Sequence, residues 1–336
     1  MSRTSIDKIP ANRRLVDELY AHGKISYEAK EYALEILHPA DNWGAWISRL
    51  LLSAGSALVL SGIVYFFAFN WTKITPFIKF SSIQIDMVGC LLGAYRYSLK
   101  SISGQILLLS ASVLTGVFMA VFGQVYQTGA DSYQLFMMWS ILILGWTIIA
   151  NFAPQWTLWL VITNTFLILW WTQAALPEPD MEFMIYAILS VFNGTALALR
   201  EYLARSKDNA WAQPKWTRVL LVIATLLPML IPIVALIVEP NRATPSIFIA
   251  AVLGFAGHAL LYFFYRYKIQ DMWSLSATAL SICIIVEATG LKVIVEMFDG
   301  LDFFMFLLMG LMTIGIFTAA VMYLRKIIDV LEVDHV

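Results

Sequence analysis

Four polar side chains interrupt or end long apolar runs of this sequence. They are Asp86, Gln124, Gln127 and Glu287. If these runs cross a lipid bilayer, the two carboxylates are costly there and mark ion or proton pathways, while the two amides can hydrogen-bond to a solute or to another helix. We therefore interpret the four residues as a candidate intramembrane polar site.

Asp86 lies within QIDMVGCLLGAYRY, and Gly89 and Gly93 follow it at three and seven residues. These spacings put the three residues on one face of a helix. A GxxxG pair allows a second helix to approach closely, so we expect Asp86 to face a helix contact and not lipid. Two interpretations remain open: a proton or cation carrier, and an acid that hydrogen-bonds to a neighbouring helix.

Glu287 lies within SICIIVEATGLKVIVEMF, five residues before Lys292. Five residues correspond to about 140° around an α-helix, whereas Lys292 and Glu296 have the i,i+4 spacing that allows a pair. Glu287 therefore needs a partner from elsewhere, for which Arg49 and His258 are candidates.

Thr289 and Gly290 follow Glu287 and make a break in the helix feasible, and discontinuous helices are a recurrent way to build ion sites at membrane depth. The alternatives for Glu287 are an ion site and a buried structural pair. His258 has no second histidine at a metal-ligand spacing, so we expect a packed histidine. We expect neither a metal site nor a cofactor.

The segment FGQVYQTGADSY contains Gln124 and Gln127 at the end of an apolar run. Gly129 offers the left-handed turn that commonly ends a helix, and Asp131 or Ser132 can cap the helix that follows. We expect the two glutamines to hydrogen-bond across helices, and a ligand contact is the alternative. Small and amide residues recur along this run on one face, which we expect to meet protein: Ser112, Gly116, Ala120, Gln124 and Gln127.

Composition decides the class of protein. Of the 336 residues, 60% are hydrophobic and 13% are charged, against roughly 25% charged in soluble domains. The apolar runs are about 18 to 25 residues long, which is the length that crosses a bilayer as a helix. The sequence thus excludes a soluble protein and predicts an all-α, polytopic transmembrane bundle. The ten predicted spans are 47–69, 77–97, 102–126, 132–150, 154–173, 182–200, 217–238, 245–265, 272–296 and 303–324.

The predicted organisation has three parts: a cytoplasmic helical leader over 1–46, a ten-span domain over 47–326 and a cytoplasmic tail over 327–336. With ten alternating spans, most of the 22 basic residues fall on the side of the N-terminus, which the positive-inside rule assigns to the cytoplasm. The leader predicts a short helical hairpin whose apolar stripe is too small for a core of its own. Spans 77–97 and 272–296 carry acids, so we expect protein to surround both.

No motif of a known catalytic class is present, and the chain has only two cysteines, Cys90 and Cys283, each within an apolar run. A disulfide framework and a CxxC metal cluster are therefore excluded. We expect no enzymatic activity and no nucleic-acid partner.

Two segments, AGSALVLSGIVYFFAFNWTKITPFIKF and FGQVYQTGADSYQLFMMW, resemble the prokaryotic family of predicted membrane proteins called domain of unknown function 2157. The resemblance covers about the first 150 residues. Its motifs are Ala68, Phe69, Asn70 and Trp71, then Lys79 and Phe80, then Gly123, Gln124, Tyr126 and Gln127. It implies a bacterial inner-membrane protein without an assigned activity. It also implies a membrane partner, because relatives are accompanied by a second multispan family with a Gly-Asp-Tyr motif.

Two functions follow as hypotheses. The first is a permease-like transporter of a small solute or lipid, which requires that the four site residues border one cavity. The second is a non-catalytic scaffold or sensor that binds another membrane or cytoplasmic protein, or assembles as a homo-oligomer, with membrane lipid around it. The residues expected to support the site are Asn70, Trp71, Tyr126, Asp131 and Lys292.

Overall fold

The structure is a computed structural model that describes residues 13–37, 73–206, 209–298 and 303–333, together with single positions between 47 and 69. The described residues form helices and turns without a strand. They divide into two compact units, Met1–Thr75 and Pro76–Val336. The all-α fold class expected from the sequence is confirmed.

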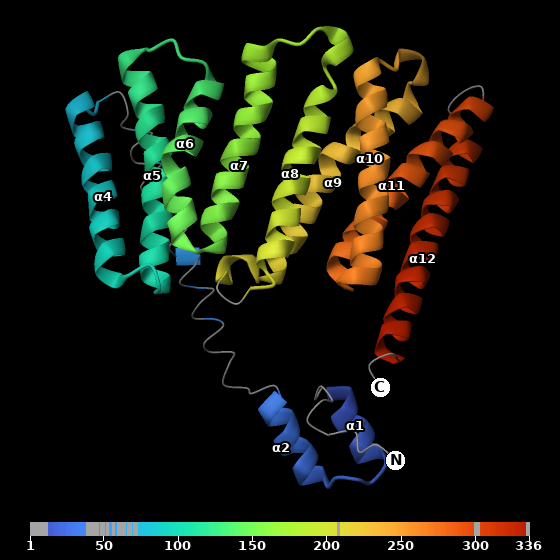
Figure 1. The fold of residues 1–336 in the computed structure, drawn as a ribbon. Helices are drawn as coiled ribbons and strands as arrows, with labels where there is room; N and C mark the ends of the chain where they lie inside the picture. The colour runs from blue at the N-terminus through green and yellow to red at the C-terminus, as the bar shows by residue number, and fades with distance from the viewer. Residues whose placement is uncertain are drawn as a thin grey trace. The chain divides into compact units, whose positions relative to one another are not determined.

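The first unit contains the predicted helical hairpin (Figure 1). Its helices are α1 (Arg13–Ala21) and α2 (Tyr27–Leu37). Gly23 adopts a positive φ of 65° between them, and the Ser26 hydroxyl accepts a hydrogen bond from the backbone of Ala29, which caps α2. An ion pair of 2.6 Å between Lys30 and Asp17 joins the two helices. The first predicted span, with Arg49, Asn70 and Trp71, lies outside the described residues except for single positions.

The second unit contains the other nine predicted spans. In the described part of the chain, nine helices are long and apolar enough to cross a membrane. They are α4 (Pro76–Tyr97), α5 (Ile102–Tyr126), α6 (Ser132–Ala150), α7 (Ala153–Trp170), α8 (Met184–Leu203), α9 (Lys215–Val238), α10 (Pro245–Phe263), α11 (Met272–Met297) and α12 (Phe303–Val333). Short turns of helix extend or connect them: η2 (Trp171–Ala175), η3 (Pro179–Met181), η4 (Ala210–Ala212), η5 (Pro240–Arg242) and η6 (Phe264–Lys268).

The helices follow one another across the bundle from α4 to α12 (Figure 1). Each packs mainly on its neighbours in the chain, and α9 also packs on α11 and α8 on α10. A buried core joins α8, α9, α10, α11, the turn η6 and the end of α12. It contains Leu197, Val222, Tyr265, Leu275 and Ile327. α4 lies at the side of the bundle away from this core and packs chiefly on α5. The expectation that protein surrounds span 77–97 is therefore not met by the described residues.

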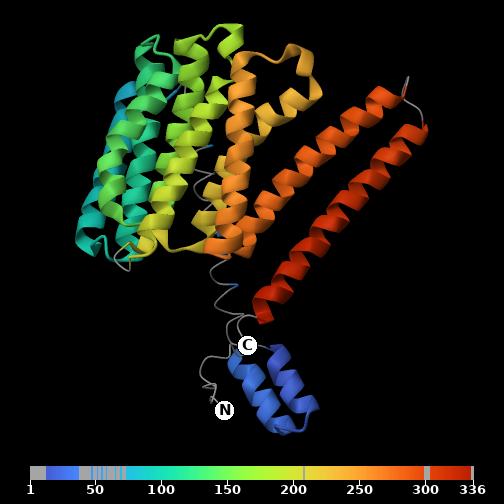
Figure 2. The same ribbon diagram turned by 45° about the vertical axis from the view of Figure 1, so that its right-hand side comes forward.

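α11 and α12 form a hairpin that leaves the rest of the bundle (Figure 2). Five of the six buried residues of α11 lie in its first half, between Ser274 and Cys283, and only Ile294 is buried beyond them. α12 packs mainly on α11, and a shallow apolar groove that includes Gly315 and Ala319 runs along it. The described residues thus cover one side of the first half of span 272–296 and little of the second half.

The nine helices alternate in direction, so their loops lie at two ends. We call one of them the α8–α9 end, after the loop that it carries (lower in Figure 1). Most basic residues of this unit gather there, as the sequence predicts: Arg96, Lys100, Arg200, Arg205, Lys215, Arg218, Arg266, Lys268, Arg325 and Lys326. That this end faces the cytoplasm stays a prediction.

Candidate functional site

The four residues of the predicted site do not come together. Asp86 lies on α4 and the two glutamines lie at the end of α5, whereas Glu287 lies on α11, at the opposite side of the row (Figure 1). A single cavity bordered by all four, which the permease hypothesis requires, is therefore not what the described residues form.

Asp86 is exposed. α4 meets α5 through the face that carries Ala94 and Phe80, and Gly93 lies at its edge against Leu107. A Cβ added at Gly89 would meet nothing within 4 Å. Asp86, Gly89 and Gly93 do share one side of the helix, but the contact with α5 is centred on the neighbouring side. The expectation that Asp86 faces this helix contact is therefore corrected.

Gln124 and Gln127 are both exposed, and neither side chain forms a hydrogen bond with another described residue. Gln127 is itself the residue that ends α5: its φ is 44°, in the left-handed region, and its N–H donates to the Gly123 carbonyl. Gly129 is also left-handed, with a φ of 64°. The predicted bonds across helices are thus absent here, and the role of Gln127 is that of a helix terminus.

The other predictions for the turn between α5 and α6 are confirmed in part. Asp131 is the N-cap residue of α6, as expected, although its side chain makes no capping hydrogen bond. The Tyr126 ring stacks on Phe80 at 5.8 Å between centroids and contacts Phe122 at 4.7 Å. The stripe of small and amide residues on α5 meets protein at Ser112 and Gly116, which are buried, and not at Gln124 and Gln127. A Cβ added to Gly116 would lie 2.4 Å from the Trp139 ring.

Glu287 faces α12 and is partly buried. Its Oε1 lies 2.5 Å from the Thr313 hydroxyl, and its Oε2 is buried without a hydrogen-bond partner. α11 continues without a break past Gly290, so the interruption that Thr289 and Gly290 make feasible does not occur. Lys292 pairs with Glu296 at 3.1 Å, as the spacing predicts.

His258 does not pair with Glu287. It is buried on α10, with Nδ1 2.8 Å from the Gly254 carbonyl and Nε2 2.7 Å from the Ser281 hydroxyl of α11. The prediction of a packed histidine is confirmed.

Other polar groups of the apolar helices also bond to neighbouring helices. The fully buried Gln155 of α7 donates to the Ser112 hydroxyl of α5 at 2.7 Å. Asn164 of α7 and Asn193 of α8 donate to each other, at 3.0 and 2.7 Å. Such bonds join transmembrane helices, with about 1 kcal/mol for each. The polar groups are thus used in helix packing.

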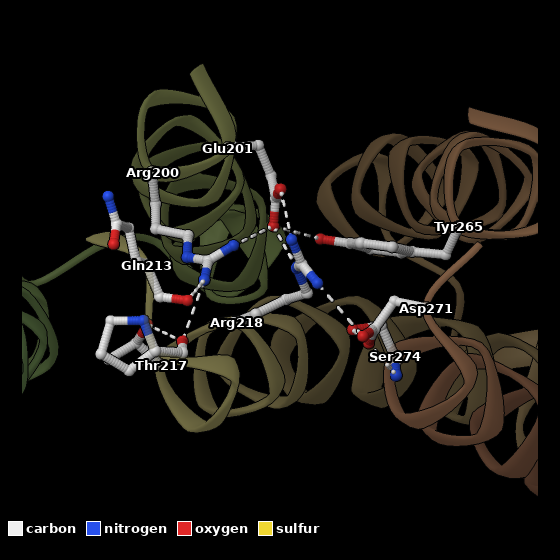
Figure 3. Close-up of polar contacts among 9 residues, drawn as sticks. Arg200, Glu201, Gln213, Thr217, Arg218, Tyr265, Asp271 and Ser274 are labelled. Carbon is white, nitrogen blue, oxygen red and sulfur yellow. Dashed lines mark hydrogen bonds and ion pairs between the residues drawn. The ribbon is translucent and has the colours of Figure 1, made fainter. Parts of the chain in front are cut away.

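Among the described residues, a large polar cluster lies at the α8–α9 end (Figure 3). We call it the ionic network, made of Arg200, Glu201, Arg218 and Asp271 with Tyr265 and Ser274. Arg218, in the first turn of α9, donates through Nε to Glu201 Oε1 at 2.7 Å and through Nη2 to Oε2 at 3.2 Å. Its Nη1 donates to Asp271 at 3.1 Å. Arg218 thus joins the end of α8 to the start of α11.

Arg200 completes the network from the last turn of α8. Its side chain is fully buried and donates to Glu201 at 2.7 Å and to the Pro214 carbonyl at 2.9 Å. The Tyr265 hydroxyl, on η6, donates to the same glutamate at 3.3 Å. Two arginines balance two carboxylates, so the network is neutral as a whole. Among the described residues there is no group of three or more metal-binding side chains.

Asp271 holds the start of α11. Its Oδ2 accepts bonds from the Ser274 N–H at 3.0 Å and the Ser274 hydroxyl at 2.7 Å, which is the geometry of an N-cap. Burial alone would raise the pKa of Asp271, but the bonds from Ser274 and the charge of Arg218 outweigh it and hold the pKa below its usual value. The ionised form is therefore the one that the fold stabilises.

The lowered pKa of Asp271 predicts how the stability of the protein depends on pH. A lowered pKa adds stability above the pKa of the unfolded chain, about 3.9 for aspartate, and that stability is lost as the pH falls through the folded pKa. We expect Asp271→Asn to be less stable than the natural protein at pH 7, and the difference to shrink below about pH 4. Thermal unfolding in detergent across this range measures it. A difference that stays constant with pH would contradict the role assigned to the carboxylate.

The sequence does not predict the ionic network, because Arg200 and Arg218 count there only among the basic residues of one side. Two signals were present in the sequence: Glu201 and Asp271 are acids near the basic residues of this end, and Asp271 with Ser274 has N-cap spacing. Gln155, Asn164 and Asn193 were also missed, although each is an amide within an apolar run.

Comparison with known proteins bears on the N-terminal part of the chain. Residues 17–156 match the family described as "Predicted membrane protein (DUF2157)", which confirms the resemblance seen in the sequence. No curated protein and no solved structure matches the chain. The matched residues run from α1 to the first turn of α7, so the ionic network and Glu287 lie beyond them.

Proposed function

We propose that this multispan membrane protein, whose residues 17–156 match the DUF2157 family, is a non-catalytic scaffold that binds a partner protein through the α1–α2 hairpin. The observation that carries the proposal is the surface of that hairpin. Of the residues with described burial in α1 and α2, only Val16 is buried, and α2 has no buried residue.

The exposed side of α2 has a definite chemistry. Glu28, Glu31 and Glu35 repeat at three and four residues, so they form one stripe along the helix. Tyr32 and Ile36 flank the stripe, at 67% and 63% exposure. Acids beside apolar side chains suit an amphipathic helix with basic residues on its contact face.

A further helix would also add apolar contacts to the α1–α2 hairpin. Two short helices cannot bury enough apolar surface for a core, and an amphipathic helix laid on such a face is a common way to recognise a partner. We therefore assign the occupant as a basic, amphipathic helix of another protein. The membrane unit serves as its anchor.

The membrane unit supports this function better than transport. A transport path needs polar groups that converge on one cavity, whereas Gln155, Asn164, Asn193 and His258 each bond to a neighbouring helix. Asp86 lies on α4 and Glu287 on α11, and these two helices lie towards opposite sides of the bundle (Figure 1).

The test places a photo-crosslinking amino acid at Tyr32 of the full-length protein in native membranes. We expect one discrete adduct, with a protein whose crosslinked segment is a helix with a basic face. Reversal of the stripe, by Glu28→Lys, Glu31→Lys and Glu35→Lys together, should abolish the adduct because it replaces attraction by repulsion.

Glu239→Lys is the matched control, since Glu239 is an exposed acid in the second unit. This variant should retain the adduct. The absence of an adduct, an adduct with lipid or with a second copy of the chain, or one that survives the triple reversal would each overturn the proposal.

A further inference from the structure

Where Glu287 meets α12, one threonine hydroxyl lies close to two oxygen atoms. Thr313 Oγ1 lies 2.5 Å from Glu287 Oε1 and 2.9 Å from the Met309 carbonyl. Both neighbours are acceptors if Glu287 is ionised, and a threonine hydroxyl has a single hydrogen to donate. The single hydrogen would then have to serve both acceptors, so neither would receive a full hydrogen bond.

A proton on Glu287 resolves the count. The carboxyl O–H then donates to Thr313 Oγ1, and the threonine hydroxyl donates to the Met309 carbonyl. Both short contacts become hydrogen bonds, and every hydrogen has one acceptor. The backbone carbonyl of Met309 lies one turn before Thr313, which is the usual position for this bond from a threonine within a helix.

The second carboxyl oxygen leads to the same conclusion. Glu287 Oε2 is buried and has no hydrogen-bond partner among the described residues. A buried, unpaired charge is far more costly than a buried, unpaired neutral oxygen. The C=O oxygen of a neutral acid can therefore remain here, whereas a carboxylate oxygen needs a donor.

No described neighbour supplies a compensating positive charge. On α11, the titratable groups near Glu287 are Cys283, one turn before it, and Lys292, which pairs with Glu296. His258 of α10 is engaged by Ser281, and the residues of α12 at this contact, Met309, Met312 and Thr313, carry no charge. Among the described groups of α9, the charged ones lie at its ends, at 215, 218 and 239.

We propose that Glu287 is a proton-binding site within the membrane, where it holds a neutral carboxylic acid between α11 and α12. The ligand is a proton, and Thr313 orients the acid that carries it. This inference is independent of the partner-binding function, because it rests on α11 and α12 alone.

Infrared spectroscopy of the full-length protein in lipid at neutral pH tests the proposal. The spectrum of the natural protein minus that of Glu287→Gln should contain the carbonyl stretch of a neutral carboxylic acid and no carboxylate bands. Glutamine can replace the protonated acid, because its NH2 group also donates to Thr313, so this variant should fold. Carboxylate bands in the difference would overturn the proposal.

A second measurement keeps the test valid if the variant does not fold. Dicyclohexylcarbodiimide is a hydrophobic reagent that modifies neutral carboxylic acids: the carboxyl oxygen adds to its central carbon, the acid proton moves to a nitrogen, and nothing leaves. Peptide mass mapping of the natural protein should find the reagent on Glu287. The exposed Glu296 should react instead with a water-soluble carbodiimide. Failure of Glu287 to react with the hydrophobic reagent would contradict the proposal.

Discussion

Replacement of Arg218 by alanine is expected to lower the free energy of unfolding by about 3 kcal/mol, the lower end of the range for loss of one partner from a buried ion pair. Arg218 makes three hydrogen bonds to two carboxylates, and its side chain is only 15% exposed. Without Arg218, Asp271 has no arginine partner. Glu201 keeps only its hydrogen bonds from Arg200 and Tyr265. Thermal or denaturant unfolding in detergent would measure the change.

Arg242→Ala is the matched control for this prediction. Arg242 also forms an ion pair, with Glu239 at 2.9 Å, but its side chain is 81% exposed. Pairs of this kind contribute between about 0 and 1 kcal/mol, so the control should unfold nearly as the natural protein does. Equal losses in both variants would show that burial of the ionic network does not set its contribution.

Replacement of Gly104 by alanine should also destabilise the protein, by about 1 to 3 kcal/mol, as for other overpacked positions. Gly104 lies in the first turn of α5, where it packs against the tight turn that follows α4. An added Cβ would lie 2.2 Å from the Ser98 carbonyl oxygen and 3.3 Å from that of Ala94. These are backbone atoms, so they cannot move aside as the end of a flexible side chain can.

Gly145→Ala provides the comparison within the same bundle. A Cβ on Gly145 would meet nothing within 4 Å, and alanine favours the helix over glycine by up to about 1 kcal/mol. Unfolding in detergent should show Gly104→Ala less stable and Gly145→Ala unchanged or more stable. An unchanged Gly104→Ala protein would mean that the turn at Ser98 can open without cost.

The helices of the second unit could be predicted from sequence because they depend on local composition. Apolar runs of spanning length gave all nine, and the loop residues that end them lie close to the expected positions. The pair of Lys292 and Glu296 could also be predicted, since i,i+4 spacing alone brings the two side chains together.

The partners of single polar residues could not be predicted in this way. Periodicity puts Asp86 and Gly93 on one side of α4, but the packing of α5 decides which side is covered. The contact of Arg218 with Asp271 joins residues 53 positions apart, and Glu287 meets Thr313 across 26 positions. No local spacing relates these residues, so only the packing of the helices reveals them.

The reciprocal amides of Asn164 and Asn193 have a consequence for how the bundle is assembled. α7 and α8 pack over a small area, yet each amide is both donor and acceptor to the other. A slide of one helix past the other by a full turn, about 5.4 Å, would break both bonds at once. The pair therefore fixes the position of α8 along the bilayer normal relative to α7. The helices that follow α8 in the chain take their depth from this contact.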